Sequence, residues 1–127
     1  MRETKLWTWH IIAGIVILVF LGLHMGIMHL DNLFHWFSSV SGERAIAWDN
    51  VMARAKMAFF LVTYIVLLGA ALYHGLHGLK TIIFELNLGK GFKRFCSVTL
   101  TVAGFALFVL GTYAAVAARA AAMKMKM

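Results

Sequence analysis

The sequence predicts an all-α integral membrane protein with three transmembrane helices and a short interfacial helix in the first connector. Of its 127 residues, 62% are hydrophobic and only 13% are charged, whereas soluble domains have roughly 45–50% apolar and about 25% charged residues. A domain this small buries too little surface to hide so much apolar area from water. Each membrane span takes about 20 apolar residues, so we expect three spans in a single membrane domain over residues 1–127.

The spans are expected at about 6–30, 57–84 and 96–118. Trp7 and Trp9 open the first span as an interfacial aromatic belt. The basic start of this span resembles a signal peptide, but its apolar run is too long for one and lacks a small-residue cleavage site. We therefore expect the first span to be retained.

The connectors contain the polar residues and the turn signals. The first connector combines charged and hydroxyl side chains with aromatic residues at 35–37 and at Trp48, which predicts the short interfacial helix. In the second connector Gly89 is expected to stop the preceding helix. The tail from Arg119 onward is expected to fray.

The net charge of +7 comes from 12 Lys and Arg residues against 5 Asp and Glu residues. The basic residues flank the apolar runs, where they meet lipid headgroups or the surface of a partner protein. No groove-reading motif is present, so nucleic acid is not an expected partner. The Lys and Arg residues divide equally between the two sides of the membrane, so their count leaves the orientation open.

Histidines inside the apolar runs are the strongest functional signal. His24 lies in the first span, and His74 and His77 lie in the second. Ionisable residues in a membrane are costly and usually mark a pathway, a cofactor or a proton relay. Three interpretations are open: hydrogen bonds between helices, a proton relay, and axial ligation of haem iron by imidazole. A relay usually needs carboxylates at depth, and no Asp or Glu lies well inside a span.

Glycines beside the span histidines favour haem. Gly75 and Gly78 flank His74 and His77, and a residue without a side chain lets a flat macrocycle approach the backbone. The same small residues are also typical of close helix packing in membranes.

The positions of the histidines along the spans limit how they combine. At about 1.5 Å per residue, His24 and His74 are expected to differ in depth by about 15 Å and cannot clamp one iron. Either two haems lie at different depths, each with a second ligand from another chain, or one haem lies near the N-terminal face and His24 is structural. His10 and His77 have similar depths, so a pair within the chain stays open as well.

The architecture and one motif resemble a known family. Three spans, an amphipathic connector and the segment 73–80, Tyr-His-Gly-Leu-His-Gly-Leu-Lys, are similar to the smaller cytochrome b anchor subunit of succinate dehydrogenase and fumarate reductase. In that family the second span has a histidine, a glycine four residues later and an acidic residue near the helix end. These positions correspond here to His74, Gly78 and Glu85.

The resemblance implies that His74 is an axial ligand of haem b and that a second membrane anchor subunit supplies the other ligand. His24 would ligate the further haem of the two-haem members. His77, Gly75 and Gly78 would border the cofactor, and Arg54 would pair with a haem propionate through its planar fork.

The resemblance also implies the surroundings of the chain. A flavoprotein subunit and an iron–sulfur subunit would dock on the cytoplasmic face of a bacterial or archaeal membrane, with the N-terminus on that side. Electrons would pass from the iron–sulfur subunit through haem to quinone, in a succinate:quinone oxidoreductase or a quinol:fumarate reductase. The chain alone would catalyse nothing.

The quinone site is expected on the far side of the membrane. Family members with a quinone site near the iron–sulfur subunit often end the second span with Asp-Tyr, but here the pair is Glu85-Leu86, and leucine donates no hydrogen bond. At the far end His29 and Asp31 lie close in sequence and can exchange protons with a quinone. The alternatives are a single-haem anchor with a structural His24 and a haem-free channel or transporter subunit with a histidine proton relay.

Overall fold

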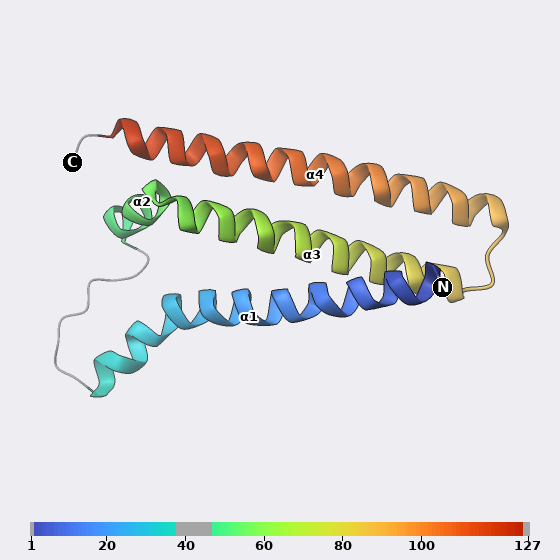
Figure 1. Ribbon diagram of the computed structural model, residues 1–127, viewed down its shortest axis with the longest axis horizontal. Helices are drawn as coiled ribbons and strands as arrows, with labels where there is room; N and C mark the ends of the chain where they lie inside the picture. Colours follow the sequence, from blue (N-terminus) through green and yellow to red (C-terminus); the bar gives the residue numbers. More distant parts are fainter. Residues whose placement is uncertain (1, 38–46, 126–127) are drawn as a thin grey trace.

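The structure, a computed structural model, describes the backbone of residues 2–37 and 47–125 and the side chains of 4–26 and 47–125. The helices are α1 (Arg2–Phe37), α2 (Trp48–Lys56), α3 (Ala58–Glu85) and α4 (Lys90–Lys124). No strand occurs in these ranges. The long helices run antiparallel, with α3 between α1 and α4 and with α2 at the end of the bundle near the C-terminus (Figure 1). Among the described residues α3 contacts both α1 and α4, which do not contact each other.

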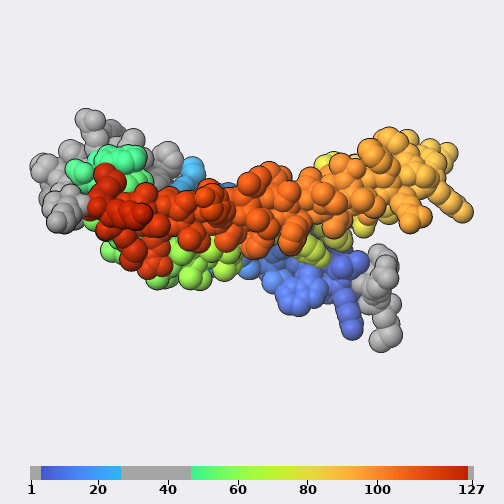
Figure 2. Space-filling view, turned by 90° about the horizontal axis from the view of Figure 1, so that it is seen from above, coloured from blue at the N-terminus to red at the C-terminus, as the bar shows by residue number. Residues whose placement is uncertain are grey.

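Three of the helices are long and apolar enough to cross a membrane: Thr4–Gly26 within α1, Ala58–Glu85 and Lys90–Lys124. Their apolar side chains point outward, with Leu18, Phe105 and Tyr113 more than 70% exposed. Figure 2 shows an elongated body with α4 running along its length. Such a shape hides less apolar surface from water than a compact globule does. Helices satisfy their own backbone groups, as lipid requires. The predicted all-α, multi-pass membrane protein is confirmed.

Glycines set the contact between α3 and α4. A Cβ atom added to Gly104 would lie 2.5 Å from a methyl carbon of Leu76, and one added to Gly111 would lie 2.5 Å from a methyl carbon of Leu68. Lipid supplies no hydrophobic force between membrane helices, so their association depends on close packing, which small residues allow. The interface therefore depends on leucines of α3 packed on glycines of α4.

Several helix ends differ from the expected ones. The backbone of α1 continues to Phe37, so the short helix α2 begins only at Trp48. α3 ends at Glu85 because Leu86 adopts an extended conformation. The prediction that Gly89 stops α3 is wrong. Gly89 precedes the first residue of α4 and has a φ of −59°. The Nζ atom of Lys93 donates a hydrogen bond of 2.7 Å to the carbonyl of Phe84, which satisfies a carbonyl that the helix end leaves free.

The predicted fraying after residue 118 is wrong for most of the tail, because α4 continues to Lys124. Ala122 in this last part is completely buried, and α4 contacts α2. Packing against α2 explains why the helix persists beyond the apolar run that marks the membrane span.

Candidate functional site

Three histidines of two helices meet in the half of the bundle that contains the start of α1. His10 of α1 and His74 of α3 are stacked, with ring centroids 4.0 Å apart and planes 9° from parallel. The ring of His77 lies 5.2 Å from that of His10 at an angle of 40°. We call these three residues the histidine cluster. It forms because α1 and α3 run antiparallel, which brings the first turns of α1 beside the last third of α3 (Figure 1).

Each stacked imidazole also lies against a glycine of the opposite helix. A Cβ atom added to Gly14 of α1 would be 3.1 Å from Cε1 and 3.3 Å from Nδ1 of His74. A Cβ atom added to Gly78 of α3 would be 3.4 Å from Cε1 of His10. The two glycines therefore make room for the two rings between helices that would otherwise be held farther apart.

One hydrogen bond selects the tautomer of His74. Its Nδ1 atom lies 3.1 Å from the backbone carbonyl oxygen of His10. A carbonyl oxygen only accepts, so Nδ1 carries the hydrogen and donates it, and in the neutral ring the lone pair is on Nε2. Histidines that bind a metal nearly always hold their other ring N–H in this way. In the neutral ring Nε2 of His74 is therefore the nitrogen that can accept a hydrogen bond or bind a metal.

Tyr73 ties the same region together from the neighbouring position on α3. Its hydroxyl donates a hydrogen bond of 3.2 Å to the carbonyl of Leu6 on α1. Its ring lies 5.4 Å from that of His77. Nδ1 of His10 is buried and has no hydrogen-bond partner among the described residues. The cluster is therefore held by contacts between α1 and α3 that involve both backbone and rings.

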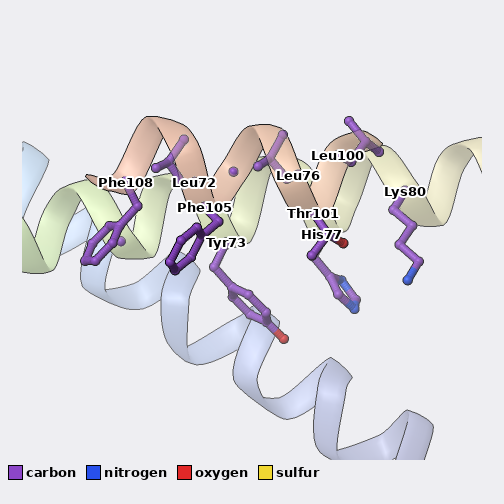
Figure 3. Close-up of a pocket in the computed structure, with 11 residues that line it drawn as sticks. Leu72, Tyr73, Leu76, His77, Lys80, Leu100, Thr101, Phe105 and Phe108 are labelled. Atoms are coloured by element: carbon purple, nitrogen blue, oxygen red, sulfur yellow. The ribbon is translucent and has the colours of Figure 1, made fainter. Parts of the chain in front are cut away.

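Beside the cluster a groove of about 410 Å³ runs between α3 and α4 and shares His77 with it. Tyr73, His77 and Lys80 project to one side of α3 along it, and Phe105 and Phe108 lie further along its wall (Figure 3). The ammonium group of Lys80 lies 5.4 Å from the ring centre of Phe84. The groove therefore has a polar end with a cation and an imidazole, and an apolar end.

The ring geometry limits how the cluster can hold a metal. Two imidazoles on opposite sides of one metal have centroids about 6 Å apart, because each metal–nitrogen bond is about 2 Å and the centroid lies about 1 Å farther. The separations of 4.0 Å and 5.2 Å are both shorter. Nor do three or more His, Cys, Asp or Glu side chains come together as a metal site within the described ranges. As they are placed, these rings do not hold one metal between them, so a metal here would take a single ligand from this cluster.

The other predicted site residues lie away from the cluster. His24 is exposed on α1, fourteen residues or about 21 Å along the helix from His10. Arg54 is half-buried in α2, beyond the first residue of α3 and more than about 24 Å along the helix axis from His74. His24 and Arg54 therefore share the opposite half of the bundle. His29 and Asp31 lie in α1, where side chains fall outside the described residues.

Gly75 and Gly78 have different surroundings. Nothing lies within 4 Å of a Cβ atom added to Gly75, whereas Gly78 packs against His10. His10 is the residue of this site that the sequence analysis left without a main role. Its depth, similar to that of His77, was the available signal, but the depth does not fix which face of the helix it occupies.

Comparisons with known proteins agree with this architecture. A protein of Thermoplasma acidophilum named succinate dehydrogenase hydrophobic membrane anchor subunit is 30% identical over 104 residues, which cover 80% of this chain and 75% of that protein. A protein of the same name from Archaeoglobus fulgidus is 24% identical over 111 residues, which cover 87% of this chain and 86% of the relative. No family model matches the chain. No solved structure matches it either.

Proposed function

The chain belongs to the family of succinate dehydrogenase hydrophobic membrane anchor subunits, and from this premise we propose that it binds haem b through His74 within a succinate dehydrogenase complex. The observation that carries the proposal is the hydrogen bond between Nδ1 of His74 and the carbonyl of His10. It leaves Nε2 as the ligand atom and restrains the ring, as the outer contacts of metal-binding histidines do.

Neighbouring residues support the same site. Gly75 follows His74 directly, and the space beside it is open to at least 4 Å, so a flat cofactor can approach the backbone. His77 and Lys80 line the groove on the adjacent side of α3. Lys80 would pair with a propionate at the polar end of this groove, because charge-assisted hydrogen bonds to carboxylates are the strong ones.

Bound haem b supplies one-electron transfer, and here it would connect an iron–sulfur subunit with quinone. The chain's own part is to hold the ring of His74 against α1, through the ring and the carbonyl of His10 and the close approach of Gly14. A second imidazole from a sister anchor subunit would leave no open position on the iron, which suits electron transfer rather than oxygen chemistry. The separations within the histidine cluster support taking that second ligand from another chain.

We further propose a second haem in the opposite half of the bundle, with His24 as its ligand and Arg54 as the cation for a propionate. The two residues lie in the same half, and an Arg fork matches a carboxylate. The quinone would bind near His29 and Asp31, which lie within α1 because the helix continues to Phe37, and these side chains would exchange protons with it. The flavoprotein and iron–sulfur subunits would dock on the cytoplasmic side, with the N-terminus and the turn between α3 and α4.

The test is the visible spectrum of the complex, purified with its partner subunits. We expect a reduced-minus-oxidised spectrum typical of b-type haem, and a His74→Ala variant that loses the haem held at this site. Leu79→Ala is the matched control, because Leu79 lies on the same helix with its side chain exposed. A wild-type complex whose spectrum lacks the bands of b-type haem would refute haem binding, and normal haem content in His74→Ala would refute His74 as the ligand.

A second candidate function is favoured by the continuity of the cluster. The ring of His10 lies beside those of His74 and His77, and neighbouring imidazoles within a membrane would serve as stations of a proton relay in a haem-free subunit. This function predicts a complex without the spectrum of b-type haem, whose proton movement is lost in His10→Ala. The same spectrum therefore separates the two candidates.

A further inference from the structure

The contacts of His74 with α1 come from two side-chain positions one helical turn apart. The ring of His10 stacks on the ring of His74 at 4.0 Å, and the backbone at Gly14 approaches the same ring so closely that a Cβ atom would lie 3.1 Å from Cε1. Residues four apart lie on one face of a helix. One face of α1 thus contacts the ring of His74 through the flat ring of His10 and through the backbone at Gly14, which lies close because glycine has no side chain.

We infer that His10 and Gly14 are positioning residues that fix the ring plane of His74 and strengthen its Nδ1–H···O hydrogen bond to α1. This inference rests on the proposed function, because it concerns the haem that His74 would hold. Neither residue is placed on the iron. Both act through the orientation of His74 and through the distance between its Nδ1 atom and the carbonyl of His10, which is 3.1 Å.

The physical consequence is a change in reduction potential. A hydrogen bond from the outer ring N–H raises the basicity of a ligating imidazole, and a more basic ligand stabilises the ferric state. Outer hydrogen bonds are among the means by which a protein tunes haem. Removing the stacked ring, or pushing the imidazole away from α1, weakens that hydrogen bond. The midpoint potential of the haem at His74 is then expected to rise.

Two substitutions test the positioning role, one by removing a contact of His74 and the other by adding bulk against its ring. His10→Ala removes the stacked ring without adding atoms, and Gly14→Ala adds a methyl group so close to the ring of His74, 3.1 Å from its Cε1 atom, that the ring must shift slightly. His10→Phe keeps a flat ring at the same position and is the conservative variant. Gly91→Ala in α4 is the control for adding a methyl group to a helical glycine, because nothing lies within 4 Å of that position.

The measurement is a redox titration of the purified complex, together with the electron paramagnetic resonance spectrum of its ferric haem. His10→Ala and Gly14→Ala should keep the wild-type haem content but raise the ferrous-to-ferric ratio at least fivefold at the wild-type midpoint potential. This ratio corresponds to about 40 mV at 59 mV per tenfold change. His10→Phe should lie closer to wild type than His10→Ala, and Gly91→Ala should equal wild type.

The outcomes separate this inference from the function on which it rests. A wild-type complex without haem refutes the proposed function. A haem-containing complex in which His10→Ala has the wild-type potential and resonance spectrum refutes the positioning role and leaves His74 as ligand. A purely structural role would lower the yield of the complex without shifting the potential of the part that assembles. If Gly14→Ala fails to assemble, His10→Ala compared with His10→Phe decides, since neither adds bulk at the contact with Gly14.

Discussion

The two histidines of α1 with described side chains lie in opposite kinds of surroundings. His10 stacks on His74 and packs on Gly78 of the neighbouring helix, whereas the side chain of His24 is exposed. Both lie on one apolar helix, so hydrophobicity alone does not distinguish them. The fold of this chain organises the site at His10 and His74, while a site at His24 depends on contacts from outside the described part of the chain.

The difference follows from where small residues face each other. In the half with His10, Gly14 and Gly78 lie at the contact between α1 and α3 and receive the rings of the opposite helix. In the half with His24, Gly22 has nothing within 4 Å, and Leu23 is exposed. Unpartnered apolar surface of this kind is where lipid or another membrane subunit binds.

The largest expected effect is on the haem content of the complex and comes from substituting His24. If a sister subunit completes a haem site there, His24→Ala removes one haem of two from the complex and leaves the one at His74. The pyridine haemochrome assay, expressed per flavin, measures the loss as a halving. The exposed neighbour Leu21 provides the control variant Leu21→Ala. An unchanged ratio in His24→Ala means a single-haem complex with a structural His24.

A smaller effect is expected from substitutions in the interface of α3 with α4, which compare the histidine half of the bundle with the rest. Gly104→Ala forces a methyl group against Leu76, which lies between the two histidines of α3, and Gly111→Ala does the same against Leu68. Overpacking of this kind costs about 1–3 kcal/mol. Both variants should lower the unfolding temperature of the purified complex to a similar degree, while only Gly104→Ala should alter the haem spectrum.

The control for this comparison is Gly91→Ala, where open space surrounds the added methyl group. Ala is favoured over Gly in helices by up to about 1 kcal/mol, so this variant should be as stable as wild type or more stable. Equal spectral changes in Gly104→Ala and Gly111→Ala would mean that strain spreads along α3 and that the two halves are not independent.

The sequence predicts the architecture because long apolar runs of about 20 residues have few alternatives in a membrane. Helix ends are less predictable, since Lys93 and Arg94 lie within α4 although charge marks the limit of the apolar run. The pairing of His10 with His74 is not predictable from the pattern, because helices that are apolar on all sides give no signal for their rotation. Depth along the helices indicates that His10, His74 and His77 can lie close together. Only the packing of α1 on α3 determines that the rings of His10 and His74 are the stacked pair.

The smallest expected effect isolates one contact of the histidine half. Tyr73→Phe removes the hydrogen bond of 3.2 Å from the hydroxyl to the carbonyl of Leu6 and keeps the ring near His77. Hydrogen bonds between membrane helices contribute about 0.6 kcal/mol on average, so the unfolding temperature should fall only slightly and the haem content should be unchanged. Tyr113→Phe is the control, because Tyr113 is 72% exposed on α4. A large loss of haem in Tyr73→Phe, but not in Tyr113→Phe, would show that the hydroxyl fixes the position of α1 against His74, and that the half with His10 is less rigid than its ring contacts indicate.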